Sequence, residues 1–169
     1  MQQHFKHNLI RCAVFISVGI VLGYFESIVF PQGLVYGIKI GISNIIVIFS
    51  MFYGGWKEAF IIGILKSVLT GLLFSSVTSI LYSFVGIVLS VAVMAILKTR
   101  FYNKYISVSG ISIAGSAAFN VGQVIMAWML TKSHQCIFLL SYMLPISVVT
   151  GLVTGIIVHL TLNKFKRGI

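Results

Sequence analysis

Long apolar runs separated by short polar breaks make up most of the chain. Each run approaches or exceeds the length needed to cross a bilayer, and the breaks contain residues that end helices, such as Pro31-Gln32-Gly33 and Gly54-Gly55. The pattern predicts six membrane-spanning helices, at residues 8–25, 34–53, 59–74, 80–97, 108–130 and 140–162. We therefore expect an all-α integral membrane fold, a six-helix bundle that forms one domain over residues 1–169.

Composition agrees with this pattern, because 59% of the residues are hydrophobic and 8% are charged. A soluble domain carries about a quarter charged residues. The net charge of +10 does not indicate a nucleic-acid binder, since such proteins present a solvated basic face and these cations lie at the ends of apolar runs. We expect a multi-pass protein of the cell membrane.

The positions of the cations also predict the orientation. If both termini are cytoplasmic, nine of the twelve lysines and arginines lie near cytoplasmic span ends, as the positive-inside rule requires. Lys39 and Lys132 then lie on the outer side, and Lys66 lies within the membrane. The nine are Lys6, Arg11, Lys57, Lys98, Arg100, Lys104, Lys164, Lys166 and Arg167.

Several polar side chains interrupt the spans, and together they predict a pocket. Lys66 lies nine residues after Lys57, roughly 13 Å into the membrane. Asn120 and Gln123 are three residues apart and hence share a helix face. With this topology all of these groups fall in the outer half or at the centre of the membrane, so we expect the pocket to open outward. The candidate ligand-binding residues are Glu26, Lys39, Ser43, Asn44, Lys66, Asn120 and Gln123.

Each candidate also has a purely structural interpretation. Lys39 could extend to the outer headgroups, and Lys66 could pair with Glu26, since an ammonium at mid-membrane costs at least ~2.5 kcal/mol without a partner or water. Asn44, Asn120 and Gln123 could be interhelical hydrogen-bonding groups worth about 1 kcal/mol each. The pattern alone leaves these alternatives open.

The sequence argues against catalysis and metal binding. It contains two acidic residues, Glu26 and Glu58, and no aspartate, so chemistry that needs clustered carboxylates is disfavoured. Cys12 and Cys136 do not form a CxxC pair, and His134 beside Cys136 lacks a third ligand. We expect no metal site, no cofactor and no enzymatic activity.

Small residues recur at four-residue spacing in three of the predicted helices. They are Gly19 and Gly23, then Gly110, Ala114, Ala118 and Gly122, then Gly151 and Gly155. Small residues at this spacing let helix backbones approach closely. We expect these positions to form helix–helix contacts.

The order of motifs resembles one known family. Gly-x-x-Glu-Ser (23–27) precedes Gly-x-Lys-x-Gly-x-x-Asn (37–44), and a third helix with a central cation ends in Thr-Gly-Leu-Leu-Phe (70–74). Ala-Gly-Ser-Ala-Ala-Phe-Asn-Val-Gly-Gln (114–123) and Ser-x-x-Thr-Gly-Leu-Val-Thr-Gly (147–155) follow. This combination, which covers nearly the whole chain, is similar to the Gx transporter family, also labelled heptaprenyl diphosphate synthase component I.

That family resembles the substrate-binding S-components of energy-coupling factor (ECF) transporters. The resemblance implies a vitamin-like small-molecule ligand held near the outer face, with a transmembrane coupling protein and ATPases as partners. It also implies docking to the coupling protein through small residues of the first helix, at Ala13 and Ser17, where serine replaces the second alanine of the usual pair. Lys66 occupies a position where many relatives carry arginine, so two-pronged recognition of an anion is less well supported.

The synthase label suggests a second possibility. Prenyl diphosphate synthases bind magnesium through aspartate-rich motifs, and a chain without aspartate does not perform that catalysis by itself. The rival to an importer subunit is therefore a membrane accessory subunit that supports isoprenoid or quinone synthesis, or extracellular electron transfer.

Overall fold

The computed structural model describes residues 2–29, 41–102 and 105–167. Within these ranges the chain is helical and contains no strand. The α-helices are α1 (Gln2–Val29), α2 (Ile45–Tyr53), α3 (Trp56–Phe74), α4 (Val77–Phe101), α5 (Val108–Thr131) and α6 (Leu139–Arg167), with short 3-10 helices η1 (Ile42–Asn44) and η2 (His134–Phe138).

The helices confirm the predicted membrane architecture. Four segments are long and apolar enough to cross a bilayer, namely Leu9–Val29, Val77–Phe101, Val108–Thr131 and His134–Lys164. Helix α3 has 19 residues, which corresponds to roughly 28 Å, and it carries Lys66. Helix α2 has nine residues and is too short to cross a bilayer core of about 30 Å by itself. The first part of the second predicted span, residues 34–40, lies outside the described residues.

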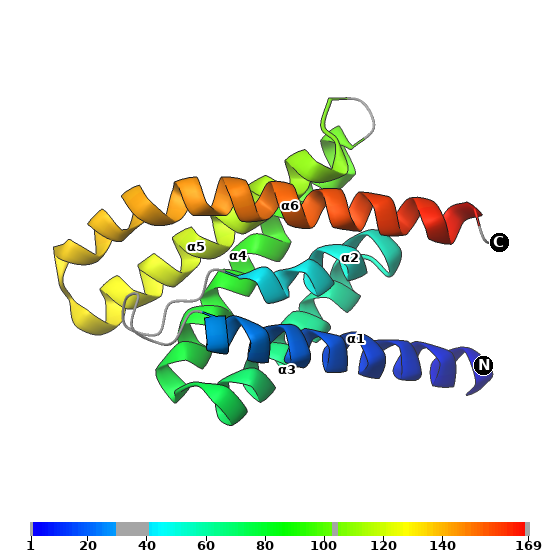
Figure 1. The fold of residues 1–169 in the computed structure, drawn as a ribbon, viewed down its shortest axis with the longest axis horizontal. Helices are drawn as coiled ribbons and strands as arrows, with labels where there is room; N and C mark the ends of the chain where they lie inside the picture. Colours follow the sequence, from blue (N-terminus) through cyan, green and yellow to red (C-terminus); the bar gives the residue numbers. More distant parts are fainter. Residues whose placement is uncertain (1, 30–40, 103–104, 168–169) are drawn as a thin grey trace.

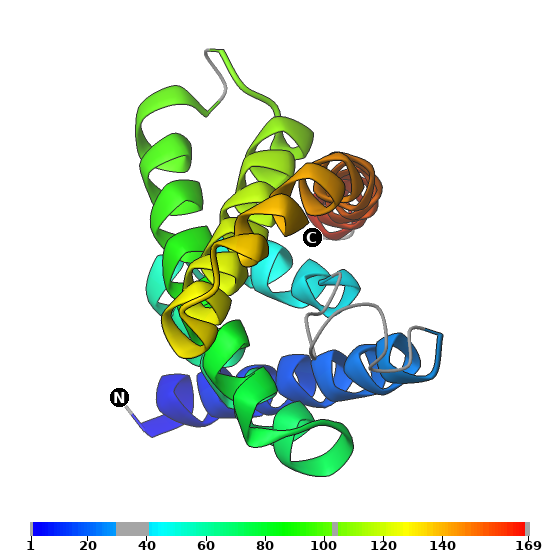
Figure 2. The ribbon, with the colours of Figure 1, turned by 90° about the vertical axis from the view of Figure 1, so that its left-hand side faces the viewer.

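The bundle is assembled from neighbouring antiparallel helices. Helix α5 packs between α4 and α6, and α3 contacts α1, α2 and α4. Figure 1 shows α2 lying between α1 and α6, with the two ends of the chain on the same side of the molecule. Figure 2 shows the same bundle from one end, with α1 and α6 well separated. This arrangement agrees with a topology in which both termini face one side of the membrane.

Helix boundaries follow local chemistry. Ser76 and Ser107 precede α4 and α5, and their hydroxyl groups accept hydrogen bonds from the backbone N–H groups of Ser79 and Gly110. The turn before α3 contains Gly55 at φ 92°, a left-handed conformation that favours glycine. Helices α3 and α4 begin before the predicted spans, because the apolar pattern marks the membrane segment whereas the hydrogen-bonded helix extends back into polar residues such as Lys57 and Thr78.

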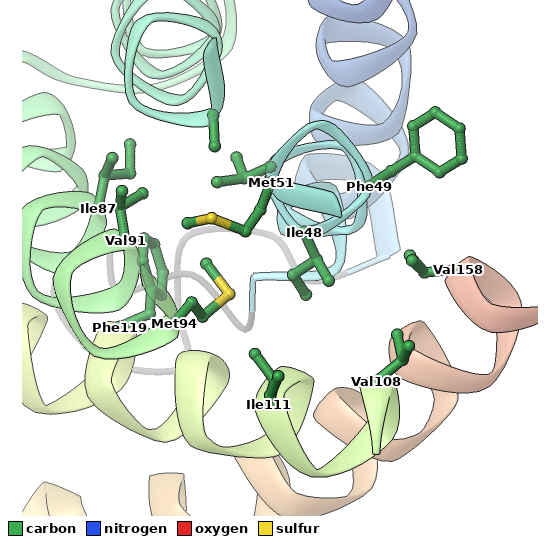
Figure 3. Close-up of a cluster of buried hydrophobic side chains, with 12 residues drawn as sticks. Ile48, Phe49, Met51, Ile87, Val91, Met94, Val108, Ile111, Phe119 and Val158 are labelled. Atoms are coloured by element: carbon green, nitrogen blue, oxygen red, sulfur yellow. The ribbon is translucent and has the colours of Figure 1, made fainter. Parts of the chain in front are cut away.

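The apolar core occupies the half of the bundle near the chain termini. Figure 3 shows Met51 of α2, Val91 and Met94 of α4, and Ile111 of α5 converging there, all of them buried. The buried polar side chains Asn44, Thr70 and Gln123 lie toward the opposite ends of these same or neighbouring helices. These three polar side chains therefore lie away from the main apolar core.

The glycines predicted to mediate close packing do so except for Gly110, where an added methyl group would lie 2.7 Å from the side chain of Ile106, just before its own helix. A methyl group added to Gly155 would lie 2.6 Å from the Cα atom of Ser109, and one added to Gly151 would lie 2.6 Å from the Cα atom of Ile113. Gly122 likewise meets the backbone of α4 at Gly86. Contacts this short leave no room for a side chain, so α5 approaches both of its neighbours through glycine.

A bidentate ion pair joins α1 to α3 near the termini. Arg11 donates from Nε to Glu58 Oε1 at 3.0 Å and from Nη2 to Oε2, and its guanidinium group lies over the Tyr53 ring. Lys98 of α4 donates to the carbonyl oxygen of Met51, near the end of α2. Helices α1 and α4 are thus both bonded to residues close to the α2–α3 turn at this end of the bundle.

Candidate functional site

Glu26, near the end of α1, holds the start of η1. Its carboxylate is buried and accepts hydrogen bonds from the backbone N–H groups of Gly41 and Ser43. Gly41 has φ 90°, and a side chain there would also meet the Asn44 amide, so glycine is required. The two N–H donors satisfy both oxygen atoms of a carboxylate that is removed from water. Glu26 therefore orders the segment that carries Ser43 and Asn44.

Lys66 of α3 reaches this segment from the opposite side. Its Nζ atom donates to Ser43 Oγ at 3.0 Å and to Asn44 Oδ1 at 2.9 Å, and its side chain is buried. Gly19 of α1 makes room for the lysine stem, because an added methyl group would lie 2.9 Å from Lys66 Cγ and Cδ. Two side chains of η1 and a glycine of α1 thus surround the buried lysine of α3.

A small cavity adjoins the ammonium group. Its free volume is about 10 Å³, which is enough for roughly one water molecule. Hydroxyl and amide groups face it from one side and an aromatic ring from the other. The lining residues are Gly41, Ser43, Asn44, Lys66, Ser67, Thr70, Ser83, Ile87 and Phe119, from η1, α3, α4 and α5 and the residue before η1.

Within the part of the chain that the structure describes, four buried polar side-chain atoms have no hydrogen-bond partner. They are Ser67 Oγ, Asn120 Oδ1 and both amide atoms of Gln123. Asn120 uses its other amide atom, Nδ2, to donate to the carbonyl oxygen of Met143 at 3.1 Å. An unpartnered buried polar group costs about 1–3 kcal/mol, so native proteins retain few of them without water, a ligand or another compensation.

Comparison with known proteins gives one result. The family model described as heptaprenyl diphosphate synthase component I matches residues 15–161. The chain belongs to the heptaprenyl diphosphate synthase component I family. No curated protein and no solved structure matches the chain.

In this family member, four of the predicted site residues come together. Glu26, Ser43, Asn44 and Lys66 form one connected hydrogen-bonded cluster, in which Ser43 contacts both charged side chains. Lys39 lies outside the described residues.

Asn120 and Gln123 share one face of α5, as their spacing predicts, and both are fully buried. They do not line the cavity beside Lys66, but they follow Phe119, which does line it. Gln123 lies one helical turn from Phe119 and extends the same face. The site therefore has two parts, a lysine cluster and an adjacent pair of amides.

Sequence reasoning missed the remaining lining residues, namely Ser67, Thr70, Ser83, Ile87 and Phe119. A partial signal was present, because Ser67 and Thr70 lie one and four residues after Lys66, and Thr70 therefore shares its helix face. Nothing in the sequence distinguished Phe119 from the other aromatic residues of an apolar helix.

The predicted docking residues lie on the exposed face of α1. Ala13 and Ser17 are both exposed, and the Ser17 hydroxyl donates to the Ala13 carbonyl oxygen at 2.9 Å. Because this hydrogen bond is within the helix, the hydroxyl group presents little unsatisfied polarity to a neighbour. The surface is small and shallow, as close approach by another helix requires.

Within the described residues, no group of three histidine, cysteine, aspartate or glutamate side chains could hold a metal ion. The two cysteines are free, and the Cys136 thiol lies 3.2 Å from the Thr131 hydroxyl oxygen. The chemistry available at the candidate site is therefore hydrogen bonding, charge and aromatic contact.

Proposed function

We propose that this chain is the substrate-binding subunit of an energy-coupling-factor-type importer in the cell membrane. It binds a small vitamin-like molecule, or a precursor of quinones or isoprenoids, within the membrane. It catalyses no reaction, and separate ATPases drive transport through a coupling membrane protein. The sequence contains no phosphate-binding loop that could hold ATP, which supports the assignment of ATP hydrolysis to partners.

The observation that carries the proposal is the buried ammonium group of Lys66 beside a polar cavity. Ionisable groups inside membrane proteins are costly, and they usually mark binding sites or transport pathways. Lys66 contacts an amide and a hydroxyl oxygen from η1, and the cavity continues to Ser67 and Phe119. Ammonium, hydroxyl and aromatic groups together suit a ligand that is anionic or is a polar aromatic molecule.

The unpartnered amides support the same proposal. Gln123 offers both a donor and an acceptor, and Asn120 offers an acceptor, all in a buried position next to Phe119. A ligand that fills the region between Lys66 and Gln123 would satisfy these groups. Because the free volume is about 10 Å³, binding requires that the elements around the cavity move apart.

The partner surface in this proposal is the exposed face of α1. Ala13 and Ser17 lie one helical turn apart, and the helix backbone is accessible there. A coupling-protein helix would pack against them. Replacing Ala13 with tryptophan should abolish assembly with the coupling protein while leaving ligand binding intact, since the residue is remote from Lys66.

Ligand binding to the purified protein tests the site. We expect Lys66→Met and Asn44→Ala to weaken affinity for the bound compound at least tenfold, which corresponds to about 1.4 kcal/mol. Lys57→Met is the matched control, because Lys57 is an exposed lysine at the start of the same helix. Unchanged affinity in both site variants would rule out this assignment.

The family description favours a second function. It names a component of a prenyl diphosphate synthase, and a membrane accessory subunit of isoprenoid or quinone synthesis, or of extracellular electron transfer, would fit that name. Co-expression followed by purification distinguishes the two. Recovery with a coupling protein and ATPases supports transport, whereas recovery with a soluble prenyl synthase subunit and no ATPase supports the accessory role.

A further inference from the structure

An apolar groove runs between α1 and α6, with α2 as its floor. It has a free volume of about 330 Å³, far larger than the cavity beside Lys66. The groove is lined by Val14, Phe15, Val18 and Leu22 of α1, Ile45, Ile46 and Phe49 of α2, and Ile157, Val158 and Thr161 of α6. Figure 1 shows α2 lying between these two long helices.

Among the described lining residues, none offers a free hydrogen-bonding side chain. Thr161 is the one polar residue of that set, and its hydroxyl group donates to the carbonyl oxygen of Ile157 at 2.7 Å. A polar or charged molecule would lose its hydration in this groove without compensation. The groove therefore suits a hydrocarbon chain.

The groove opens sideways into the membrane. Its two walls belong to segments that are long and apolar enough to span a bilayer. Val14, Val18 and Ile157 are exposed at its rim. An occupant therefore enters from the hydrocarbon phase and not from water.

Among the described residues, Arg11 and Lys164 are the cations that continue the lining faces, and both are at the end of the groove nearer to the chain termini. Arg11 precedes Val14 by three residues and Lys164 follows Thr161 by three, so each continues a lining face of its helix. The hydrogen bonds to Glu58 use two of the five N–H donors of Arg11, and Lys164 is exposed. At the opposite end, Glu26 follows Leu22 by four residues, and its buried carboxylate is bonded to backbone N–H groups. This charge distribution favours an occupant with an anionic group at the Arg11 end.

We propose that the groove is a binding site for one hydrocarbon chain of an anionic phospholipid, with the lipid phosphate at Arg11 and Lys164. The lipid belongs to the leaflet on the side of the chain termini. The site is separate from the Lys66 cluster, so the proposal does not depend on the proposed transport function. A neutral lipid has the same hydrocarbon chains but lacks the net negative charge that attracts Arg11 and Lys164.

Native mass spectrometry of the purified protein tests this, with dioleoyl phosphatidylglycerol and dioleoyl phosphatidylcholine as probes. We expect saturable retention of one phosphatidylglycerol molecule, with at least tenfold preference over phosphatidylcholine. Adjacent isoleucines of α6 supply a matched pair of variants. Ile157 lines the groove and is 46% exposed, whereas Ile156 does not line it and is 45% exposed. Ile157→Trp should abolish retention, and Ile156→Trp should preserve it.

The charge requirement has its own control. Lys164→Gln should reduce the preference for phosphatidylglycerol several-fold, and Lys57→Gln, at an exposed lysine away from the groove, should leave it unchanged. Equal retention by the two isoleucine variants, or retention that never saturates, would overturn the proposal. A homodimer that Ile157→Trp dissociates would also overturn it, because a second copy would then occupy the groove.

Discussion

At the scale of single residues, the interior contains two kinds of buried polar group. Ser112 is buried and shares a hydrogen bond with Thr154 at 2.9 Å, and Ser50 donates to the carbonyl oxygen of Val47. Gln123 is as deeply buried, but neither of its amide atoms has a hydrogen-bond partner among the described residues. Buried polar groups that are hydrogen-bonded stabilise the bundle. Unpartnered ones lower the free energy of unfolding, so their retention indicates another purpose.

This difference predicts opposite effects of two substitutions. Gln123→Met removes two unpartnered atoms at similar size, so it should raise the free energy of unfolding by about 1–2 kcal/mol. Ser112→Ala breaks a satisfied pair and should lower it by about 1 kcal/mol. Thermal unfolding in detergent measures both. A Gln123→Met variant that is less stable than wild type would show that the amide has a structural role.

The sequence allowed much of the lysine cluster to be predicted, for a physical reason. Charged and amide groups are rare in membrane helices, so Glu26, Asn44 and Lys66 were recognisable by type alone. Their partners were less predictable. That Glu26 bonds to the backbone of Gly41 and Ser43 depends on a chain reversal between α1 and η1, and no local pattern encodes which backbone groups a carboxylate meets.

At the scale of helices, glycine contacts determine how closely the bundle packs. A methyl group at Gly155 would meet the backbone of α5 at Ser109, which cannot move aside as a flexible side chain could. Gly23 instead meets the side chain of Thr70, on α3. The α5–α6 contact should therefore tolerate less change than the α1–α3 contact.

Gly155→Ala should accordingly lower the free energy of unfolding by about 1–3 kcal/mol, because α6 must shift away from α5. Val153→Ala, on the exposed face of the same helix, is the control and should change stability by less than about 0.5 kcal/mol. Chemical or thermal unfolding gives both values. Equal stability of the two variants would contradict the close packing described for α5 and α6.

Helix number and order were predictable from hydropathy, but two features of the helices were not. The ion pair between Arg11 and Glu58 joins residues 47 positions apart, and no local pattern links them. The shortness of α2 was also hidden, because its nine residues continue an apolar run in the sequence. Long-range pairing and the start of a helix within an apolar run depend on tertiary packing.

At the scale of the whole molecule, the main apolar core and the Lys66 cluster lie toward different ends of the bundle. The termini and the Arg11–Glu58 pair lie at the end that contains the main apolar core, while the Lys66 cluster lies toward the other end. If the termini are cytoplasmic, as the positions of the cations predict, the end with the Lys66 cluster faces outward. A ligand would then reach Lys66 from outside the cell, with the main apolar core closing the inner side.

Labelling of single cysteines in intact cells tests this orientation. In a variant that lacks Cys12 and Cys136, a cysteine at Ser133 should react with a membrane-impermeant thiol reagent. A cysteine at Thr99 should react only after the membrane is permeabilised. Both positions are at polar helix ends, so accessibility and not burial decides the outcome. The reverse labelling pattern would invert the topology.

The central claim is that the buried lysine cluster binds a small molecule. Mass spectrometry of small molecules extracted from the purified protein tests it most directly, using wild type, Lys66→Met and the control Lys57→Met. We predict one compound at near-equimolar amount in wild type and in Lys57→Met, and at least tenfold less in Lys66→Met. An equal amount of the same compound in all three proteins would contradict the account. The absence of any bound compound from wild-type protein purified from its native cells would also contradict it.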